Sequence, residues 1–351
     1  MPSIPNGASM MSVTEQLLSQ FITRLLQTPQ PDLRTLAVEL KVEIKQILEI
    51  IEWLQGVDVN VAIDGGQVFF ATPLYLIDKK MLEQRLPCRI FYFQTVDSTN
   101  QFLLNHQLQL QAGDLCIAEH QTQGRGRQGK TWVAAYGCSV CFSLIHRLSN
   151  GFGDMSGLSL VIGIAIADCL NRLGIKDVAL KWPNDVYRQS KKLAGILIES
   201  NYDPSHGGTA LTIGVGLNLI HSQPLSLSPF ADLADKVHLP DFKSRLVIAL
   251  WHAIQAALIL YEAQGFASFQ QRWLLFDLYY QKQVYIYDGL KTYVGRHDGI
   301  DHKGYLILAQ SDGQRVRFNH AVSLRLVSEN NLMNEMVSPF TENEVSMSPR
   351  R

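Results

Sequence analysis

Residues 124–132 read Gly-Arg-Gly-Arg-Gln-Gly-Lys-Thr-Trp, and the chain on either side of them decides between two kinds of fold. The stretch fits the phosphate-loop pattern G-x-x-x-x-G-K-[ST] as well as G-x-G-x-x-G. Both patterns require an apolar strand directly before the first glycine and a helix directly after the loop. Here polar residues 119–123 precede the loop, and Gly137 stands where the first turn of a helix would lie. The sequence therefore predicts neither fold, but a basic, glycine-spaced loop that can wrap an anionic ligand.

The composition of the chain sets wide limits on its function. It has 351 residues, enough for two or three domains, and a net charge of −1, which favours no global attraction to nucleic acid or membranes. No apolar run reaches the length of a membrane span, and residues 1–10 do not resemble a targeting segment. Of the five cysteines, Cys138 and Cys141 form a C-x-x-C pair, but strand positions three apart face opposite ways, which disfavours a shared metal. We expect a reduced, cytoplasmic protein with no membrane segment.

Hydrophobic periodicity divides the chain into three blocks, which together indicate an α+β protein. Between residues 12 and 73, helical patterns over 13–27, 32–40 and 44–56 precede a hairpin, 57–61 and 67–70, around Asp64-Gly65-Gly66. That order is the layout of a winged helix-turn-helix. Residues 1–11 are expected to be disordered.

The second block, residues 74–278, mixes strands and helices. Helices are predicted over 158–173 and 242–261, and strands over 178–182, 193–199 and 210–219, with the last two paired antiparallel. The third block, residues 279–327, contains short strands with turns at Asp288-Gly289, Asp298-Gly299 and Asp312-Gly313, which indicates a small antiparallel barrel. The polar tail, 328–351, is predicted to be disordered.

Polar clusters stand at the ends of the elements of the middle block. In chain order they are Asp97-Ser-Thr-Asn100, Gly124–Trp132, Lys181-Trp-Pro-Asn-Asp185, Lys191-Lys-Leu-Ala-Gly-Ile-Leu-Ile-Glu199 and Ile213-Gly-Val-Gly-Leu-Asn218. Each has a simple structural interpretation when taken alone. Ser98 can serve only as a helix cap, Lys192 can be solvated, and Gly214 and Gly216 can mark a bulge or close packing. Their combination in this order is more specific than any one of them.

Together the clusters resemble the biotin–protein ligase family over residues 85–327, and the first block adds the layout of its bifunctional ligase/biotin-operon-repressor subgroup. The resemblance implies a central ligase domain of the class II aminoacyl-tRNA-synthetase/biotin-ligase type and a C-terminal SH3-like barrel. It also implies that biotin and Mg-ATP give biotinyl-5′-AMP, after which biotin passes to a Lys of a biotin carboxyl carrier protein. The resemblance implies two further partners. One is a second copy of the chain, in a homodimer that forms when the adenylate binds, and the other is operator DNA.

The resemblance also assigns roles to residues. Lys192 and Arg127 are the implied catalytic residues, and Arg125, Gly126 and Arg127 would fold over the intermediate. The biotin pocket would be lined by Ser98, Thr99, Asn100, Gln121, Arg125, Gly126, Arg127, Lys192, Gly195, Gly214 and Gly216. The nucleotide would meet Trp132, Lys130, Asn184, Asp185 and Asn218, with Asp185 a candidate for contact with Mg. No dedicated set of metal ligands is expected.

Two features depart from the family pattern. Cys141 stands where the strand after Trp132 usually carries an aromatic residue, so the resemblance does not specify the packing of the biotin pocket, although the implied chemistry is unaffected. Residues 10–73 carry four basic and eight acidic side chains, 4 − 8 = −4, and residues 43–55 hold three Glu and one Lys. DNA affinity depends on cationic contacts to phosphate, so this charge disfavours strong operator binding and favours a structural or protein-docking module.

Two other functions stay open from the sequence. One is a biotin-sensing DNA-binding regulator whose ligase domain is weak or vestigial. The other is a phosphate-loop NTPase that hydrolyses ATP without biotin, which the missing helix after Thr131 disfavours.

Overall fold

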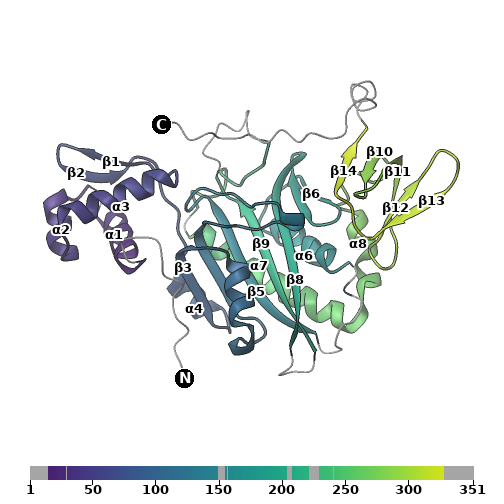
Figure 1. Cartoon of the computed structure of the whole chain (residues 1–351), viewed down its shortest axis with the longest axis horizontal. Helices are drawn as coiled ribbons and strands as arrows, with labels where there is room; N and C mark the ends of the chain where they lie inside the picture. Colours follow the sequence, from purple (N-terminus) through teal and green to yellow (C-terminus); the bar gives the residue numbers. More distant parts are fainter. Residues whose placement is uncertain are drawn as a thin grey trace. The chain divides into compact units, whose positions relative to one another are not determined.

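The computed structural model describes residues 15–28, 30–148, 155, 157–203, 208–220, 229–239 and 241–327. The chain divides into two compact units, residues 1–278 and 279–351 (Figure 1). The predictions of disorder for residues 1–11 and 328–351 fall outside the described residues.

The first block of unit 1 contains the predicted helices and hairpin, namely α1 (Glu15–Gln27), α2 (Leu33–Leu40), α3 (Ile44–Gly56), β1 (Val61–Asp64) and β2 (Gln67–Phe70). Asp32 caps α2 by accepting a hydrogen bond from the backbone of Arg34 at 2.8 Å. The prediction that the first strand begins at Val57 was wrong. Val57 caps the C-terminus of α3, and the N–H of Val59 donates to Leu54 O at 2.9 Å, so the chain becomes extended only from Val61.

The core of this block includes one residue from far along the chain, Tyr136. It lies in the same hydrophobic cluster as Phe21, Leu36 and Ile47, and its ring meets that of Trp53 edge-on at 5.8 Å. Its hydroxyl group donates to Gln94, whose own N–H donates to Glu15 at 2.8 Å. The segment that follows Trp132 is therefore packed into the helical block.

The centre of unit 1 is a seven-stranded mixed sheet with the order β3-β4-β5-β9-β8-β7-β6. Its strands are β3 (Ile90–Val96), β4 (Leu115–Gln121), β5 (Ser139–Leu148), β6 (Val178–Lys181), β7 (Asp185–Arg188), β8 (Lys191–Asp203) and β9 (Gly208–Asn218). Only β3 and β4 pair in parallel. The predicted antiparallel pairing of β8 with β9 is confirmed, with Gly195 opposite Gly216.

Helices pack on both faces of the sheet. α6 (Leu158–Arg172) and α7 (Phe242–Gln264) contact each other, and Ile196 of β8 reaches toward Gly163 of α6. α5 (Thr99–His106) contacts β4, β5 and β9, and its first turn carries Asn100 against Gly214. Ile196 and Leu197 point to opposite faces of β8, and Leu197 pairs with Gly214, so α5 lies on the face opposite α6. The unit also contains the short helices α4 (Lys79–Arg85) and α8 (Gln270–Leu274).

By length and composition, α7 is the one helix among the described residues that could cross a membrane. Its packing identifies it instead as a core helix. Lys243 in its first turn forms a buried ion pair with Glu119 of β4 and donates to Gly137 O at 3.0 Å. The N–H of Ile77 and the hydroxyl of Tyr92 satisfy the other carboxylate oxygen at 2.7 and 3.0 Å, as a buried charge requires.

Unit 2 is a five-stranded antiparallel sheet with the order β13-β12-β11-β10-β14. Its strands are β10 (Gln283–Tyr287), β11 (Thr292–Ile300), β12 (Leu306–Ala309), β13 (Arg315–Phe318) and β14 (Ser323–Leu326). The predicted turn at Asp298-Gly299 was wrong, because both residues lie inside β11 where the register with β12 shifts. The chain reverses instead over 301–305, where Asp301 accepts two backbone N–H groups at 2.9 and 3.0 Å.

Candidate active site

One face of the central sheet gathers most of the residues singled out from the sequence. Side chains two apart on a strand share a face, and the pairing registers align three strands row by row. One row is Ser143, Gly214 and Leu197, and the next is Cys141, Gly216 and Gly195. Each row has one glycine of β9 at its centre. Because glycine has no side chain, a neighbouring group can approach the backbone closely at this face.

The first row is bordered by a chain of hydrogen bonds. The N–H and hydroxyl of Thr99 both donate to Gln121 Oε1, at 2.8 and 3.1 Å, and the Thr99 hydroxyl lies 2.7 Å from that of Ser143. Ser143 in turn contacts Asn100 through its hydroxyl group. Thr99, Asn100 and Ser143 are buried, so these groups are held in fixed orientations.

The chain continues from Asn100 to the basic loop. Asn100 Nδ2 donates to Glu199 Oε2 at 2.8 Å, and Arg125 Nη2 donates to the same oxygen at 2.6 Å. The close approach of Asn100 depends on Gly214, because a Cβ there would lie 2.2 Å from Asn100 Oδ1. The simple structural interpretation of Gly214, close packing, is thus confirmed.

The second row carries cations at its edge. Lys192 Nζ lies 2.8 Å from Asp185 Oδ1, and Arg127 Nη1 donates to Asn184 Oδ1 at 3.1 Å. Asn184 is fixed from the other side, since its Nδ2 donates to Ile196 O at 2.9 Å. Burial lowers the pKa of Arg127, with Asp185 acting in the opposite direction, and a guanidinium stays charged at neutral pH. The edge therefore presents two cations to an anionic ligand.

The indole of Trp132 lies over the glycines of the second row. A Cβ on Gly216 would lie 2.5 Å from Trp132 Cε2, and one on Gly195 would lie 3.4 Å from Trp132 Cζ3 and 3.5 Å from Lys192 Nζ. The indole and Lys192 therefore meet at Gly195.

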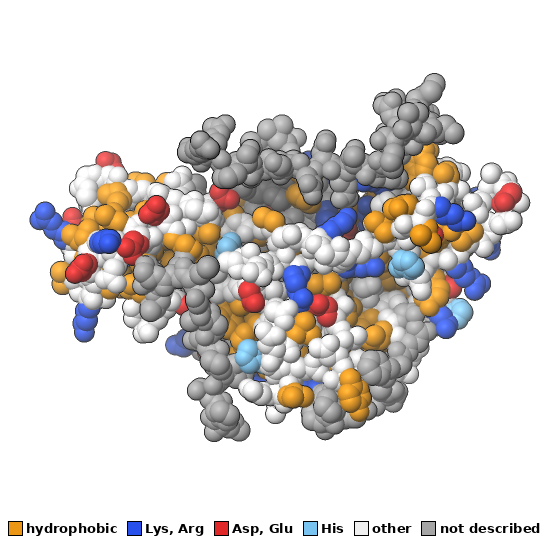
Figure 2. All heavy atoms as spheres, in the orientation of Figure 1, with side chains coloured by type: hydrophobic (Ala, Val, Ile, Leu, Met, Phe, Trp, Pro, Cys, Tyr) orange, Lys and Arg blue, Asp and Glu red, His pale blue; other side chains and the backbone are white. Residues whose placement is uncertain are grey.

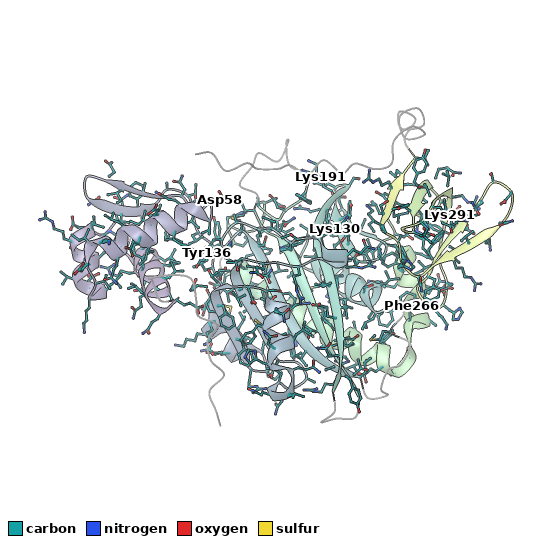
Figure 3. The ribbon with its side chains drawn as sticks, viewed as in Figure 1. Asp58, Lys130, Tyr136, Lys191, Phe266 and Lys291 are labelled. Carbon is teal, nitrogen blue, oxygen red and sulfur yellow. The ribbon has the colours of Figure 1, made fainter. Side chains whose placement is uncertain are left out.

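The basic loop closes on itself rather than entering a helix. Trp132 N donates to Gly124 O at 2.9 Å, Gly126 N donates to Lys130 O at 2.6 Å, and Arg125 forms a bridge with Thr131. Only a short 3₁₀ turn, η2 (Arg127–Gly129), interrupts it, and Lys130 is exposed. Figure 3 labels Lys130 in this loop and Tyr136 beyond it. A phosphate loop needs a helix starting at Lys130-Thr131, so this geometry argues against one.

The remaining residues predicted for the site lie at its margins. Ser98 is the N-cap of α5, and its hydroxyl accepts from Gln101 N at 3.5 Å. Asn218 donates to Ala231 O at 3.2 Å, and Ala231 N donates to Lys192 O at 2.8 Å. Asn218 therefore fixes the segment that runs beside Lys192.

Sequence reasoning missed two residues, Glu199 and Ser143. Glu199 is the last residue of its motif, and a carboxylate at the end of an apolar strand was a signal that could have singled it out. Ser143 had no such signal, because a serine in a strand is common. Cys141 lies opposite Gly216, and burial raises the pKa of its thiol to about 11, so it contributes a neutral side chain to the floor.

Comparisons with known proteins agree with this arrangement. Residues 91–218 match the model of the biotin/lipoate A/B protein ligase family. The bifunctional ligase/repressor BirA of Escherichia coli K12 is 34% identical over 286 residues, which are 80% of this chain and 87% of that protein. The chain belongs to the biotin/lipoate A/B protein ligase family. Its central block is thus a ligase domain, and all five polar clusters lie within the matched residues, namely 97–100, 124–132, 181–185, 191–199 and 213–218.

One further relative and one solved structure are also similar to this chain. The biotin–[acetyl-CoA-carboxylase] ligase of Paracoccus denitrificans is 31% identical over 63% of this chain and 94% of that protein. A solved structure of the biotin protein ligase of Aquifex aeolicus, in complex with biotin and ATP, aligns with a TM-score of 0.59 and 25% identity. It covers 68% of this chain and 99% of that chain. The central mixed sheet with its helices is therefore the biotin protein ligase fold.

Proposed function

We propose that the chain activates biotin with ATP to biotinyl-5′-AMP and transfers biotin to a Lys of a biotin carboxyl carrier protein. The observation that carries the proposal is the position of Lys192 and Arg127 beside a buried polar floor on one face of the sheet. An acid bound on that floor, with its polar ring groups toward Thr99 and Gln121, would direct its carboxylate to the two cations.

The proposed reaction has two steps. An oxygen of the biotin carboxylate attacks the α-phosphorus of ATP, the bond to the bridging oxygen breaks, and pyrophosphate leaves. The amine of the acceptor Lys then attacks the acyl carbon, AMP leaves, and the amine loses a proton. The first step brings two anions together, so Lys192 and Arg127 would reduce their repulsion and stabilise the charge on the phosphate oxygens.

Mg²⁺ fits this site as an ion held mainly by substrate. Among the described residues no group of three or more His, Cys, Asp or Glu could hold a metal. One carboxylate, Asp185, with the amide of Asn184 beside it, matches the way Mg²⁺ binds through few protein oxygens and several phosphate oxygens. When bound, the ion would neutralise charge on the departing pyrophosphate.

Incubation with labelled biotin, Mg-ATP and a carrier domain tests the proposal directly. We expect label on the acceptor Lys, and none on a carrier in which that Lys is replaced by Arg. ATP hydrolysis that does not depend on biotin, with no labelled carrier, would instead favour the phosphate-loop NTPase.

Replacing Arg127 by glycine is expected to weaken retention of the adenylate by about tenfold to a hundredfold, because one charge-assisted contact to the intermediate is lost. The measurement is the release rate of labelled biotinyl-AMP after a chase with unlabelled biotin. Gln128→Gly is the matched control, because it adds a glycine to the exposed part of the same loop, at a residue with positive φ, without removing a cation. Equal release from both variants would contradict the assignment of Arg127.

For the first block we propose a winged helix-turn-helix, and for unit 2 an SH3-like barrel. The order of three helices and a hairpin supports the first name, and the five short antiparallel strands support the second. The division into the domains 12–73, 74–278 and 279–327, a cytoplasmic location, and a homodimer formed with biotinyl-AMP all stay proposals.

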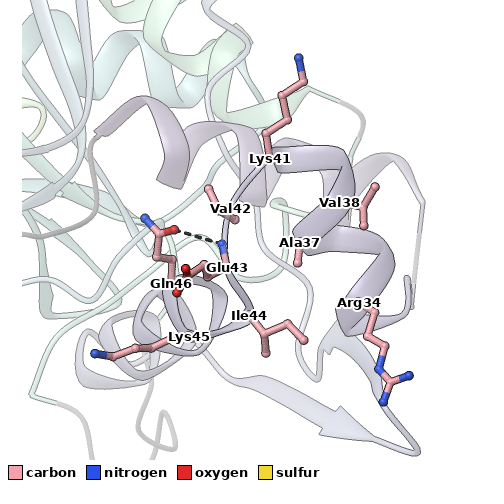
Figure 4. A pocket seen from close by; sticks show the side chains of 9 residues that line it. All are labelled: Arg34, Ala37, Val38, Lys41, Val42, Glu43, Ile44, Lys45 and Gln46. Carbon is pink, nitrogen blue, oxygen red and sulfur yellow. Dashed lines mark hydrogen bonds between the residues drawn. The ribbon is translucent and has the colours of Figure 1, made fainter.

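A groove between α2 and α3 is the feature of the first block that bears on DNA binding. It is lined by Arg34, Ala37, Val38, Lys41, Val42, Glu43, Ile44, Lys45 and Gln46 (Figure 4). Three of the four basic side chains of the block therefore lie around the helix-turn-helix, while the fourth, Arg24, is paired with Glu39 at 2.6 Å. Over the face shown in Figure 2, acidic and basic side chains are interspersed on this block. The second candidate function, a biotin-responsive DNA-binding regulator, rests on this groove.

Gel-shift titration with biotin and ATP separates the two functions. We expect no sequence-specific shift at physiological salt, because the block carries an excess of acidic side chains. If only the three groove cations meet phosphates, log affinity should fall with log salt concentration with a slope of about −3. A tight, sequence-specific complex or a much steeper slope would overturn this expectation.

A further inference from the structure

We infer that Glu199 is a positioning residue for the ligase reaction, which orients Arg125 toward the bound acid and holds the base of the basic loop against the pocket. This inference rests on the proposed function. It concerns a residue that neither the resemblance nor the pattern of motifs assigned to the site.

Glu199 brings together two groups that come from distant parts of the chain. Its Oε2 accepts from Arg125 Nη2 at 2.6 Å and from Asn100 Nδ2 at 2.8 Å. Its side chain is 28% exposed and that of Arg125 is 34% exposed, so water screens the pair less than it screens a surface ion pair. Both contacts are charge-assisted, and both fix a donor that faces the same pocket.

The ion pair with Glu199 occupies one nitrogen of Arg125 and leaves another nitrogen available to donate to a ligand. With Nη2 held by Glu199, the Nε of Arg125 is buried and has no hydrogen-bond partner among the described residues. A buried guanidinium N–H without an acceptor is costly. An acceptor oxygen of the bound acid would satisfy it, so Glu199 holds the guanidinium as a preorganised donor toward that acid.

The same carboxylate connects the floor of the pocket to the loop. Asn100 is the last member of the hydrogen-bond chain that begins at Gln121, and Arg125 is bridged to Thr131, next to Trp132. Holding Arg125 in place therefore also holds the two ends of the basic loop together. Loss of Glu199 should loosen the loop while leaving the cations on the opposite edge, Lys192 and Arg127, with their own partners.

The test compares Glu199→Gln, Arg125→Gln and the double variant, with Glu39→Gln as control. Glu39 also pairs with an arginine, Arg24, but in the helices of the first block. We expect the KM for biotin and the release rate of biotinyl-AMP to rise about tenfold in either single variant. The double variant should resemble the singles, because both changes remove one interaction. The rate of biotin transfer from the bound adenylate to the carrier should stay within about twofold of wild type. General destabilisation would not raise the KM for biotin and the release rate while leaving the transfer rate unchanged.

The inference fails if Glu199→Gln behaves as Glu39→Gln does, or if its effect adds fully to that of Arg125→Gln. Should Glu199→Gln not fold, the Arg125→Gln variant decides, because wild-type retention of the adenylate in that variant would overturn the inference. A wild-type protein that makes no adenylate would refute the proposed function instead, so the two failures are distinguishable.

Discussion

Replacing Lys192 by alanine is expected to lower the rate of biotinyl-adenylate formation by about a hundredfold to a thousandfold, the range seen when one preorganised charge-stabilising group is lost from an active site. The ammonium group lies 2.8 Å from Asp185 and would lie 3.5 Å from a Cβ on Gly195, which the indole of Trp132 also approaches. An alanine leaves Asp185 without its cation at the place where two anions must meet, so both the attacking carboxylate and the phosphate are repelled.

Single-turnover formation of labelled biotinyl-AMP measures this effect. Lys191→Ala is the matched control, because neighbouring residues of a strand point to opposite faces. We expect the control to retain nearly the wild-type rate and the melting temperatures of both variants to be similar. A Lys192→Ala variant as fast as the control would show that the assigned reaction centre is wrong.

Replacing Gly216 by alanine is expected to weaken nucleotide-dependent activation of biotin by at least about tenfold. The added methyl group would lie 2.5 Å from Cε2 of Trp132 and 2.8 Å from its Cδ2, far inside contact distance, so the indole has to leave its place. Gly216 needs no positive φ, so the cost is one of space and not of backbone conformation.

The KM for ATP in adenylate formation and the fluorescence of Trp132 both report this displacement. Gly56→Ala is the control, since a Cβ there would meet no atom within 4 Å. In a Trp132→Ala background, Gly216→Ala should have little further effect, because the methyl group no longer meets the indole. If the two changes are additive, the steric account is incorrect.

The sequence predicted those features of the site that depend only on residues adjacent in the chain. Ser98 could be assigned as a helix cap and the glycines of β9 as places of close packing, because each property depends on a few adjacent residues. The order of the motifs placed them on one domain. In unit 2, Asp-Gly at 298–299 has the composition of a turn, yet its place inside β11 is set by pairing with β12.

The contacts between motifs could not be predicted in this way. The pair of Arg125 with Glu199 joins residues 74 apart in sequence, and nothing near either residue indicates the other. No sequence pattern singled out Tyr136, yet it completes the core of the helical block. Such contacts follow from the order of strands in the sheet, which a single sequence does not specify.

The buried thiols of this ligase have a practical consequence. All five cysteines are unpaired, and burial raises the pKa of each, to about 12 for Cys88 and about 11 for Cys141 and Cys169. Because the thiolate is the reactive form, these thiols react slowly with alkylating reagents at neutral pH. A cysteine introduced at Val133, which is 83% exposed next to Trp132, would therefore take up an alkylating dye with little background. The native cysteines thus leave a background of low reactivity against which the segment beside Trp132 can be labelled selectively.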